Sequence, residues 1–383
     1  MKVCDVVLNS VWLDPRVTKQ VAEYVNAGID VVCVGMKCRR YDEEKIMAMP
    51  CKVTLVERNA FCGGKQKLVL KKLLREKYRI DSVVKAIIDE RPDVIHANDL
   101  DALIPSFKAM KKLGCRLIYD SHEINCENRM YNKYWLYNKY MKHKERSIVK
   151  KCDKMICVSN AAADYFVDLY KIEKPMIITN CNRKDDIITE LPEKHEGFEV
   201  LNHGVLHDSR GLEWMVESCE ALENYTDIKM VARGYGGIEE KLKKQVKDEK
   251  IDNFIFYPPV DPKQLIPQAA KSHVGVAITL PVCLNFKLSV SNRLFEYAAA
   301  GLPVIMSDIP EHRYLNDLYQ FGIVIDDNKQ DAFKEAVLRL YNDKDFYNKC
   351  SNNAKKLANE IMWEAQFAPV IEYVRSIGAN NNE

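Results

Sequence analysis

The stretch NRLFEYAAAGLPVI, residues 292–305, carries the signals that decide the fold. It opens with polar residues suited to a helix start and continues through small alanines that let the helix lie close to a neighbouring sheet. Gly301 suits the left-handed position after a helix, and Pro303 discourages its continuation. The apolar residues that follow read as a strand. A helix that stops at glycine and leads directly into an apolar strand is typical of an α/β protein.

The same alternation extends along the whole chain. In the first half, short runs rich in Val and Ile are separated by segments of helical periodicity, and after residue 197 the pattern restarts. Short, almost continuously apolar strands between helices are typical of parallel sheets covered on both faces. The expected strands are 3–8, 30–34, 52–56, 93–97, 116–119, 155–158, 176–179, 198–201, 228–232, 254–257, 274–278, 303–306 and 322–325. The expected helices include 17–27, 65–90, 211–222, 237–247, 261–269, 290–300, 332–342, 346–360 and 363–376.

These patterns predict two doubly wound, Rossmann-like α/β domains facing each other across a cleft. The length of 383 residues suits two domains, and 47% hydrophobic with 29% charged residues excludes disorder, collagen and coiled coil as the main architecture. The polar segment 184–196 contains Pro192 and mixed charges, so it is expected to be a linker. The predicted domains are therefore residues 1–183 and 197–362, and ligands are expected at the carboxyl ends of their strands.

Cysteine usage and charge indicate the compartment and the partners. The 13 cysteines include no Cys-x-x-Cys pair, no apolar run reaches the roughly 18 residues of a membrane span, and residues 2–8 read as a strand rather than a secretion signal. A cytoplasmic protein is expected. The net charge of +2 combines a basic first half with an acidic second half. The basic half favours an anionic surface or ligand, with a merely solvated basic surface as the alternative. No nucleic-acid partner is expected.

The second half contains a candidate nucleotide pocket. The string LNHGVLHDSRG (201–211) leads from a strand through Gly204 to Arg210 at a helix start, where amides and a cation suit a phosphate. The string ARGYGG (232–237) adds Gly234 and Gly236, and Glu296 offers a carboxylate for ribose hydroxyls. The alternative is structural, because glycines are common at strand ends and Glu296 could be an ordinary surface acid.

The strings GVLHDSRG (204–211), EYAAAGLPVI (296–305) and DSHE (120–123) resemble the signatures of the retaining glycosyltransferases of the GT-B fold, family 4 (group 1 type). The resemblance covers nearly the whole chain. It implies that the C-terminal domain holds a nucleotide-diphosphate sugar, UDP- or GDP-linked, and that the N-terminal domain holds a glycan or lipid-linked acceptor. It implies no further cofactor and no metal. It also suggests that the last helix, about 363–383, packs back on the first domain.

Carried over position by position, the resemblance assigns roles to five residues. Glu296 binds the donor ribose, Arg210 binds the diphosphate, and His122 faces the donor sugar. Asn292 and Arg293 match an Asn-Lys pair of the related motif. These assignments make His122, Arg210 and Glu296 the expected catalytic residues, with the glycines at 204, 234 and 236 in the donor site.

Two departures from the family pattern leave questions open. The usual arginine after the first loop glycine is Val205 here, and either Arg233 or Arg293 could replace that phosphate cation. The first glutamate of the family's Glu-x7-Glu falls at Leu288, so donor hydroxyls are expected to meet groups within residues 285–292.

The first domain contributes candidate acceptor residues. Asp14 and Arg16 lie after the first strand, where the resemblance makes them part of the cleft wall; the alternative is a helix start capped by Asp14 with Pro15 at its first position. Asp99 follows the fourth strand and could simply cap the next helix.

Residues 120–123 end the fifth strand of this domain. Asp120 and Glu123 flank His122 there, and all three are expected at the acceptor side of the cleft. For His122 the alternative is a structural imidazole that is hydrogen-bonded to Glu123 or another neighbour.

Two segments of the first half are both basic and apolar. Residues 131–151 interleave Tyr and Trp with Lys, and residues 65–79 place Lys and Arg around leucines. Such helices can lie on an anionic membrane, which makes a peripheral association possible. An ordinary helix with a solvated basic face is the equal alternative.

The expected reaction transfers a sugar to an acceptor hydroxyl with retention of configuration, in polysaccharide or glycolipid assembly, and cations and amides stabilise the departing diphosphate. One rival is a nucleotide-sugar 2-epimerase, for which the necessary paired carboxylates cannot be assembled from this sequence. The other is a catalytically degenerate nucleotide-sugar-binding protein, which Val205 and Leu288 leave open. A dinucleotide dehydrogenase is disfavoured because Gly-x-Gly-x-x-Gly is absent after the first strand.

Overall fold

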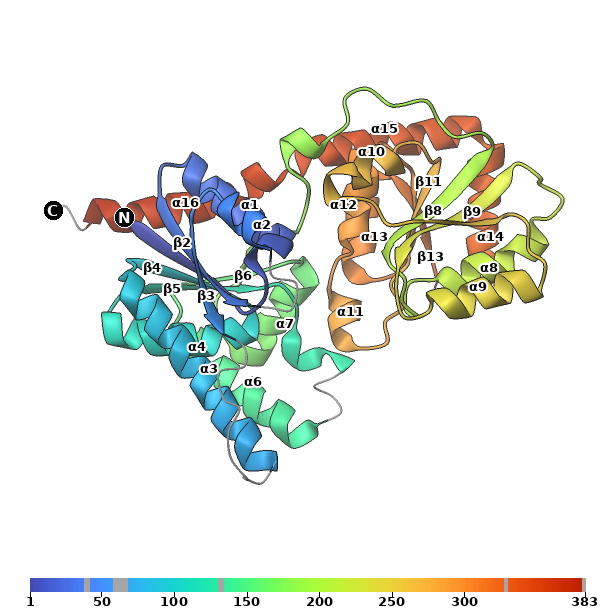
Figure 1. The fold of residues 1–383 in the computed structure, drawn as a ribbon. Helices are drawn as coiled ribbons and strands as arrows, with labels where there is room; N and C mark the ends of the chain where they lie inside the picture. Colours follow the sequence, from blue (N-terminus) through green and yellow to red (C-terminus); the bar gives the residue numbers. More distant parts are fainter. Residues whose placement is uncertain (38–41, 58–67, 130–133, 327–329, 381–383) are drawn as a thin grey trace. The chain divides into compact units, whose positions relative to one another are not determined.

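The computed structural model describes residues 1–37, 42–57, 68–129, 134–326 and 330–380, and the chain divides into two compact units (Figure 1). Unit 1 consists of Met1–Ile178 together with Glu364–Glu383, and unit 2 consists of Thr179–Trp363. The segment expected as a linker, 184–196, is part of unit 2. Within it, Lys194 Nζ donates to two main-chain carbonyls at 2.9 and 2.7 Å, and His195 N donates to a third at 2.8 Å.

Unit 1 is built on a parallel sheet of seven strands in the order β3-β2-β1-β4-β5-β6-β7. The order reverses between β1 and β4, which is where ligands bind in doubly wound sheets. Every strand expected in this half is present, with small shifts at the ends. The strands are β1 Lys2–Val7, β2 Asp30–Lys37, β3 Lys52–Glu57, β4 Val94–Asn98, β5 Arg116–Ser121, β6 Lys154–Cys157 and β7 Met176–Ile177.

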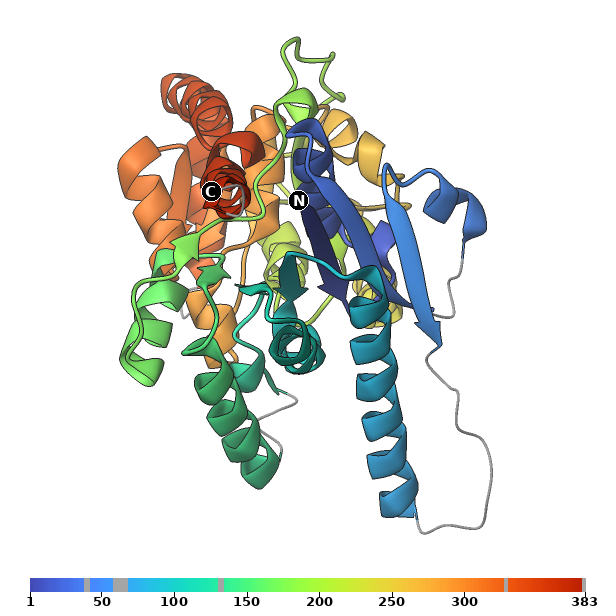
Figure 2. The ribbon, with the colours of Figure 1, turned by 90° about the vertical axis from the view of Figure 1, so that its left-hand side faces the viewer.

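The helices of unit 1 cover both faces of this sheet (Figure 2). On one face α3 packs against α4, and α4 packs against α6. The other face is covered by α1 and by α16, whose Phe367 ring lies 5.4 Å from Tyr24 of α1 and 6.2 Å from His96 of β4. The helices are α1 Pro15–Asn26, α2 Glu43–Met47, α3 Leu68–Glu90, α4 Asp99–Leu113, α6 Trp135–Val149, α7 Asn160–Tyr170 and α16 Trp363–Asn380, which starts at the last residue of unit 2.

Unit 2 repeats the plan with a parallel sheet of six strands in the order β10-β9-β8-β11-β12-β13. Its order reverses between β8 and β11. The strands are β8 Phe198–Val205, β9 Ile228–Tyr235, β10 Phe254–Tyr257, β11 Val274–Ala277, β12 Val304–Ser307 and β13 Gly322–Ile325. The helices are α8 Leu212–Ala221, α9 Glu239–Asp248, α10 Leu265–Ala269, α11 Leu284–Leu288, α12 Asn292–Ala299, α13 Pro310–Tyr319, α14 Gln330–Asn342 and α15 Lys344–Glu360. The doubly wound α/β class expected from the sequence is therefore confirmed.

The glycine strings of unit 2 are strand ends rather than the loops expected from the sequence. β8 and β9 continue to Val205 and Tyr235, and Gly204 pairs directly with Gly234. A Cβ atom at Gly234 would lie 1.9 Å from the carbonyl oxygen of Gly204, and both glycines have positive φ angles, 104° and 142°. Glycine is therefore needed here so that two strands can run on in contact where a side chain would end the pairing.

Two findings bear on the expected membrane segments. None of the helices in the described part of the chain is long and apolar enough to cross a bilayer. In the basic segment 65–79, residues 65–67 and the side chains up to 76 lie outside the described part, and so do residues 131–133 of the other segment.

Candidate functional site

The carboxyl ends of β1, β4 and β5 in unit 1 surround a fully buried carboxylate, Asp120. Arg16 of α1 binds it with two parallel hydrogen bonds, Nε to Oδ2 at 2.9 Å and Nη2 to Oδ1 at 2.8 Å, and Gln20 Nε2 donates to Oδ2 at 2.6 Å. Burial alone would raise the pKa of Asp120, but the guanidinium of Arg16, together with the nearby His122, holds this pKa well below its usual range. Arg16 is 2% exposed and therefore positions Asp120 rather than facing solvent.

His122 lies directly after β5, and its ring has a defined tautomer. Asn98, the last residue of β4, donates through Nδ2 to Asp5 and to the Val6 carbonyl at 3.2 Å, which leaves its Oδ1 as the acceptor facing His122. The distance from His122 Nε2 to Asn98 Oδ1 is 2.9 Å, so Nε2 carries the proton. Burial lowers the pKa of His122 to about 4, against the opposing charge of Asp120. The imidazole is therefore neutral at pH 7.

The other nitrogen of this ring faces Asp99. The distance from His122 Nδ1 to Asp99 Oδ2 is 3.5 Å, and the main-chain N–H of His122 donates to Asp99 Oδ1 at 3.0 Å. Asp99 has a φ angle of 65°, a strained conformation for a residue other than glycine. Burial, with Asp101 and Glu123 nearby, raises the pKa of Asp99 well above its usual value. Its carboxyl group is thus held against His122, and the N-cap residue of α4 is Asn98 rather than Asp99.

The remaining expected residues of unit 1 have ordinary local roles. Asp14 caps α1, since its Oδ1 accepts from the main-chain N–H of Arg16 and of Val17 and Pro15 is the first helical residue, so the capped helix start is confirmed. Glu123 is exposed, and its Oε2 accepts from Asn128 Nδ2 at 2.5 Å. The partner of His122 is therefore Asn98 rather than Glu123.

In unit 2, Glu296 is held at the strand ends by His203. His203 Nε2 donates to Glu296 Oε2 at 2.7 Å, with the His203 side chain fully buried and that of Glu296 24% exposed. The His203 ring stacks on Tyr297 at 4.4 Å, and its main-chain N–H donates to the Tyr297 hydroxyl, which in turn donates to Leu201 O at 3.0 Å. Glu296 and Tyr297 are neighbours on α12, so this helix is anchored to the end of β8 beside the carboxylate.

Arg293 is buried beneath the same cluster. Its guanidinium donates to Asn202 Oδ1 at 3.0 Å and to the carbonyls of Val276 and Ile278 at 3.1 and 2.6 Å. These bonds tie the ends of β8 and β11 to the start of α12. Burial, with Arg210 nearby, lowers the pKa of Arg293 to about 9. Because the guanidinium donates its hydrogen bonds to groups of the protein, Arg293 is disfavoured as the substitute phosphate cation.

Arg233 and Arg210 occupy different surroundings. Arg233 is 6% exposed, and its guanidinium lies 4.7 Å over the Tyr257 ring. Arg210 is half-buried and directly precedes Gly211, the N-cap residue of α8, so a cation stands beside that helix start. Asn292 is exposed at the first position of α12.

Two of the supporting residues were not identified as functional from the sequence. Asn98 directly precedes Asp99, and His203 occurs in the string quoted for Arg210; the signal that could have found them is their position as the last polar residues of buried strands. In the described part of the chain, no group of three or more His, Cys, Asp or Glu side chains is arranged to hold a metal ion.

Comparison with protein families assigns the two halves separately. The model described as Glycosyltransferase Family 4 matches residues 16–181, and the model described as Glycosyl transferases group 1 matches residues 183–357. The chain belongs to these glycosyltransferases. The two matches meet near residue 182, close to the boundary between unit 1 and unit 2.

Solved structures show that this glycosyltransferase has the GT-B fold. A sucrose-phosphate synthase from Thermosynechococcus elongatus superposes with a TM-score of 0.77 at 12% identity, covering 99% of this chain and 100% of that one. Anabaena HepE in complex with UDP and glucose superposes with a TM-score of 0.74 at 13% identity, covering 98% of this chain and 100% of that one. A lipopolysaccharide outer core galactosyltransferase superposes with a TM-score of 0.67 at 15% identity, covering 97% of this chain and 99% of that one.

Curated relatives of this glycosyltransferase match over shorter stretches. Probable sucrose-phosphate synthase 2 of Craterostigma plantagineum is 26% identical over 208 residues, which are 52% of this chain and 18% of the relative. Sucrose-phosphate synthase 1 of Arabidopsis thaliana is 26% identical over 163 residues, 38% of this chain and 15% of the relative. The match thus spans less than a fifth of each relative's own length.

Proposed function

We propose that this glycosyltransferase moves a sugar from a nucleotide-diphosphate sugar to an acceptor hydroxyl with retention of configuration and without a metal ion. Unit 2 holds the donor and unit 1 holds the acceptor. The observation that carries the proposal is the Glu296 carboxylate, fixed by buried His203 and still 24% exposed beside the paired glycine ends of β8 and β9. A carboxylate held in this way can accept two ribose hydroxyls, and glycines let the nucleotide approach the main chain.

The diphosphate is bound by the start of α8 and by Arg210. Main-chain N–H groups at a helix start bind phosphate, and Arg210 precedes the N-cap residue Gly211. Negative charge builds on the diphosphate as it leaves, so these fixed donors lower the barrier. HepE, which shares the fold, has been solved with UDP and with UDP-glucose, which favours a UDP-linked donor here.

His122 of unit 1 faces the sugar of the donor and forms hydrogen bonds with it. A neutral imidazole with a fixed tautomer is a hydrogen-bonding group without charge, as a sugar hydroxyl requires. Its loss is expected to reduce transfer much more than nucleoside-diphosphate affinity, because the nucleotide binds to the other unit.

The donor proposal is tested by calorimetry with UDP and GDP, followed by NMR of the product anomer. Wild-type protein is expected to bind UDP without added metal and in the presence of EDTA. Arg210→Ala is expected to weaken binding by about 1.5–3 kcal/mol. Change of the nucleotide sugar without any acceptor would indicate an epimerase, and binding without hydrolysis or transfer would indicate a degenerate binding protein.

We also propose that unit 1 associates reversibly with anionic membranes, where a lipid-linked acceptor would be found. The first residues of α6 and the residue before it are large, apolar and outside the core: Tyr134, Trp135, Leu136 and Tyr137 are 62%, 68%, 65% and 53% exposed. The N-terminal ends of α6 and of the basic helix α3 extend in the same direction from unit 1 (Figures 1 and 2). Aromatic side chains beside lysines suit a bilayer interface.

The membrane proposal is tested by vesicle co-sedimentation. Wild-type protein is expected to bind anionic and not zwitterionic vesicles at low salt, and to be released at high salt. Replacing Trp135 and Leu136 by Ser should abolish binding, while UDP affinity in unit 2 stays unchanged. No binding to anionic vesicles at low salt would leave α6 as a solvated helix and a soluble acceptor as the better choice.

A further inference from the structure

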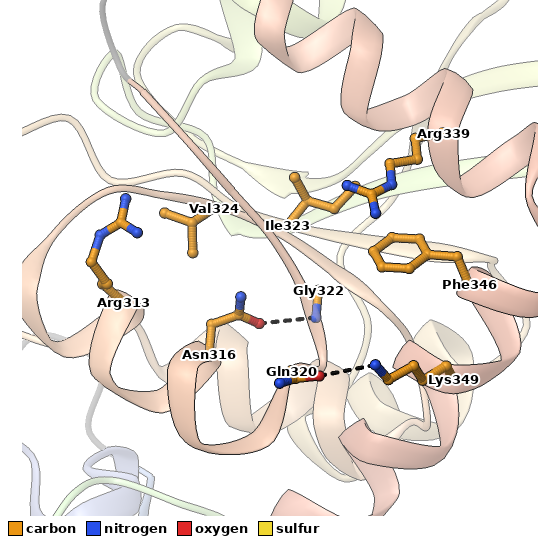
Figure 3. A pocket seen from close by; sticks show the side chains of 9 residues that line it. All are labelled: Arg313, Asn316, Gln320, Gly322, Ile323, Val324, Arg339, Phe346 and Lys349. Carbon is orange, nitrogen blue, oxygen red and sulfur yellow. Dashed lines mark hydrogen bonds between the residues drawn. The ribbon is translucent and has the colours of Figure 1, made fainter.

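The outer edge of the unit 2 sheet is hollowed into a groove. β13 is the last strand of this sheet, and a cavity of about 450 Å³ opens along it between α13, α14 and α15 (Figure 3). Ile323 and Val324 of the strand form its floor. The groove lies at the side of the sheet, whereas the donor residues lie at the carboxyl ends of β8 and β9.

Backbone groups of β13 face into this edge. Val304 N of β12 donates to Phe321 O, and Asp308 N donates to Ile325 O, so the odd-numbered residues of the strand turn their polar groups toward β12. Alternate residues of a strand point to opposite edges, so Gly322 and Val324 direct theirs outward. Gly322 N–H is bound by Asn316 Oδ1 at 3.1 Å. The N–H and C=O of Val324 therefore remain as an outward-facing donor and acceptor.

Cations stand on both sides of this strand. Figure 3 shows Arg313 on one side and Arg339 with Lys349 on the other. Arg313 is paired with Asp308 outside the groove, Arg339 lies 3.9 Å over the Phe346 ring, and Lys349 Nζ donates to Gln320 Oε1 at 2.9 Å. Among the described residues, no carboxylate lines the groove and none forms an ion pair with Arg339 or Lys349.

We propose that the β13 edge binds an extended acidic segment of a partner protein by strand addition. The segment pairs with Val324 through its main chain, and its acidic side chains meet Arg313 on one side and Arg339 and Lys349 on the other. Strand addition supplies affinity through main-chain hydrogen bonds and specificity through alternate side chains. A free anion would use the cations but not the backbone of Val324, and this distinction makes the proposal testable. The interaction goes beyond glycosyl transfer and does not depend on it.

The test uses the full chain and a fluorescein-labelled peptide of seven residues with blocked ends, in which consecutive Glu residues flanked by Val point to both faces of the added strand. Binding is followed by fluorescence anisotropy, and the amide exchange of Val324 is followed by NMR. The acidic peptide is expected to bind and to slow the exchange of the Val324 amide. The same peptide with Lys in place of Glu is expected not to bind. A peptide N-methylated at the residues that pair with β13 is expected to bind at least tenfold more weakly, because it lacks main-chain donors.

Charge variants locate the site. The double variant Arg339→Glu, Lys349→Glu is expected to lower the peptide affinity at least tenfold, whereas the matched change Lys356→Glu, at an exposed position of α15, is expected to leave it unchanged. Val324→Pro removes the outward N–H without touching the bonds to β12, because proline is tolerated where a strand edge faces solvent. It is expected to weaken binding as strongly as N-methylation of the peptide. UDP affinity, measured in parallel, reports that unit 2 remains folded.

Three results would overturn the proposal. The first is no binding of the acidic peptide to folded wild-type protein. The second is equal binding of the N-methylated peptide, or full competition by inorganic phosphate with no change in Val324 exchange, which would assign the cations to a simple anion. The third is a loss of peptide affinity in the Lys356→Glu variant equal to that in the Arg339→Glu, Lys349→Glu variant. This result would show that the peptide is attracted by the general surface charge rather than by the groove.

Discussion

The strand ends of the two units both gather buried polar side chains, but they neutralise charge in opposite ways. In unit 1 the central group is an anion, Asp120, which is fully buried and balanced by the guanidinium of Arg16. In unit 2 the central group is a cation, Arg293, whose partners are carbonyl, amide and hydroxyl oxygens. The carboxylate beside it, Glu296, is partly exposed and is held by a histidine.

This difference supports the proposed division of donor and acceptor between the units. In unit 1 the buried charges of Asp120 and Arg16 pair with each other. The neighbouring imidazole of His122 is neutral, which suits the uncharged hydroxyls of a sugar. In unit 2 the hydrogen bonds of Arg293 go to protein oxygens, and Arg210 stands at the start of α8, where a cation suits a diphosphate. The proposed division of donor and acceptor between the units therefore rests on electrostatics as well as on the sequence motifs.

The largest expected effect is the loss of charge balance in unit 1. Asp120→Asn leaves Arg16 buried without a counter-ion, and breaking a buried pair in this way costs about 3–5 kcal/mol. Amide exchange of β5 under native conditions measures the local free energy of opening. The matched control is Asp308→Asn, which breaks the exposed pair with Arg313 and should cost less than about 1 kcal/mol. Similar small losses in both variants would contradict the contrast between the units.

In unit 2 the corresponding carboxylate should matter for binding rather than for stability. Glu296→Ala removes the proposed charge-assisted bonds to ribose and is expected to weaken UDP binding by about 1.5–3 kcal/mol. Its thermal midpoint should fall less than that of Asp120→Asn, because the change leaves one neutral donor, His203 Nε2, without its acceptor rather than an unpaired buried charge. Isothermal calorimetry with UDP checks the first quantity and calorimetric unfolding the second. An unchanged affinity would remove Glu296 from the site.

A smaller effect is expected from the residue that orients Glu296. His203→Leu removes the N–H donor and is expected to lower UDP affinity about tenfold, or ~1.4 kcal/mol. His203→Gln keeps a donor and should restore most of the affinity. In the Glu296→Ala background neither change at His203 should matter, since the group it positions is gone. Additive losses in the double variants would show that His203 acts only through packing.

The smallest expected effect is the pH dependence that His122 adds to stability. His273 and His312 of unit 2, whose pKa values burial also lowers, contribute equally to wild type and to a His122 variant. The pKa of His122 is about 4 in the folded chain and about 6.5 when unfolded, so the unfolded state takes up the proton first as the pH falls. Stability contributed by neutral His122 is complete above pH 6.5 and is lost between about pH 6.5 and 4. At pH 6 the loss is about 0.8 kcal/mol. Unfolding of wild type and His122→Gln at pH 7.5 and 6 should differ by that amount, and parallel curves would contradict the assignment.

The sheets were predictable from the sequence because fully buried parallel strands are continuously apolar. All thirteen expected strands are present, and β13 has the expected ends, 322 and 325. The ends of β8 and β9 were missed because Gly204 and Gly234 signal a loop locally, whereas their pairing depends on two strands meeting in space. Helix α13 was missed because half of its ten residues are charged or polar, although Pro310 at its first position suits a helix start.

The candidate site was only partly predictable. Glu296 and His122 stand at strand ends and helix starts that can be recognised from local sequence. The partners of Arg16 and Arg293 could not be anticipated, since Asp120 and Asn202 lie 104 and 91 positions away along the chain. From the sequence, a charged side chain next to a motif is interpreted as a ligand contact. Only the folded structure shows that Arg16 and Arg293 donate their hydrogen bonds to other groups of the protein.

The position of α16 constrains how the chain can be made. Unit 2 is a continuous segment, but unit 1 needs its last helix, whose Phe367, Val370 and Val374 are buried. During synthesis the first strands are made long before this helix, so Tyr24 and His96 stay without Phe367 until the whole of unit 2, residues 179–363, has been made. The whole of unit 2 is therefore synthesised before unit 1 receives its last helix. A chain truncated after residue 363 would therefore contain a complete second unit and a first unit that lacks its last helix.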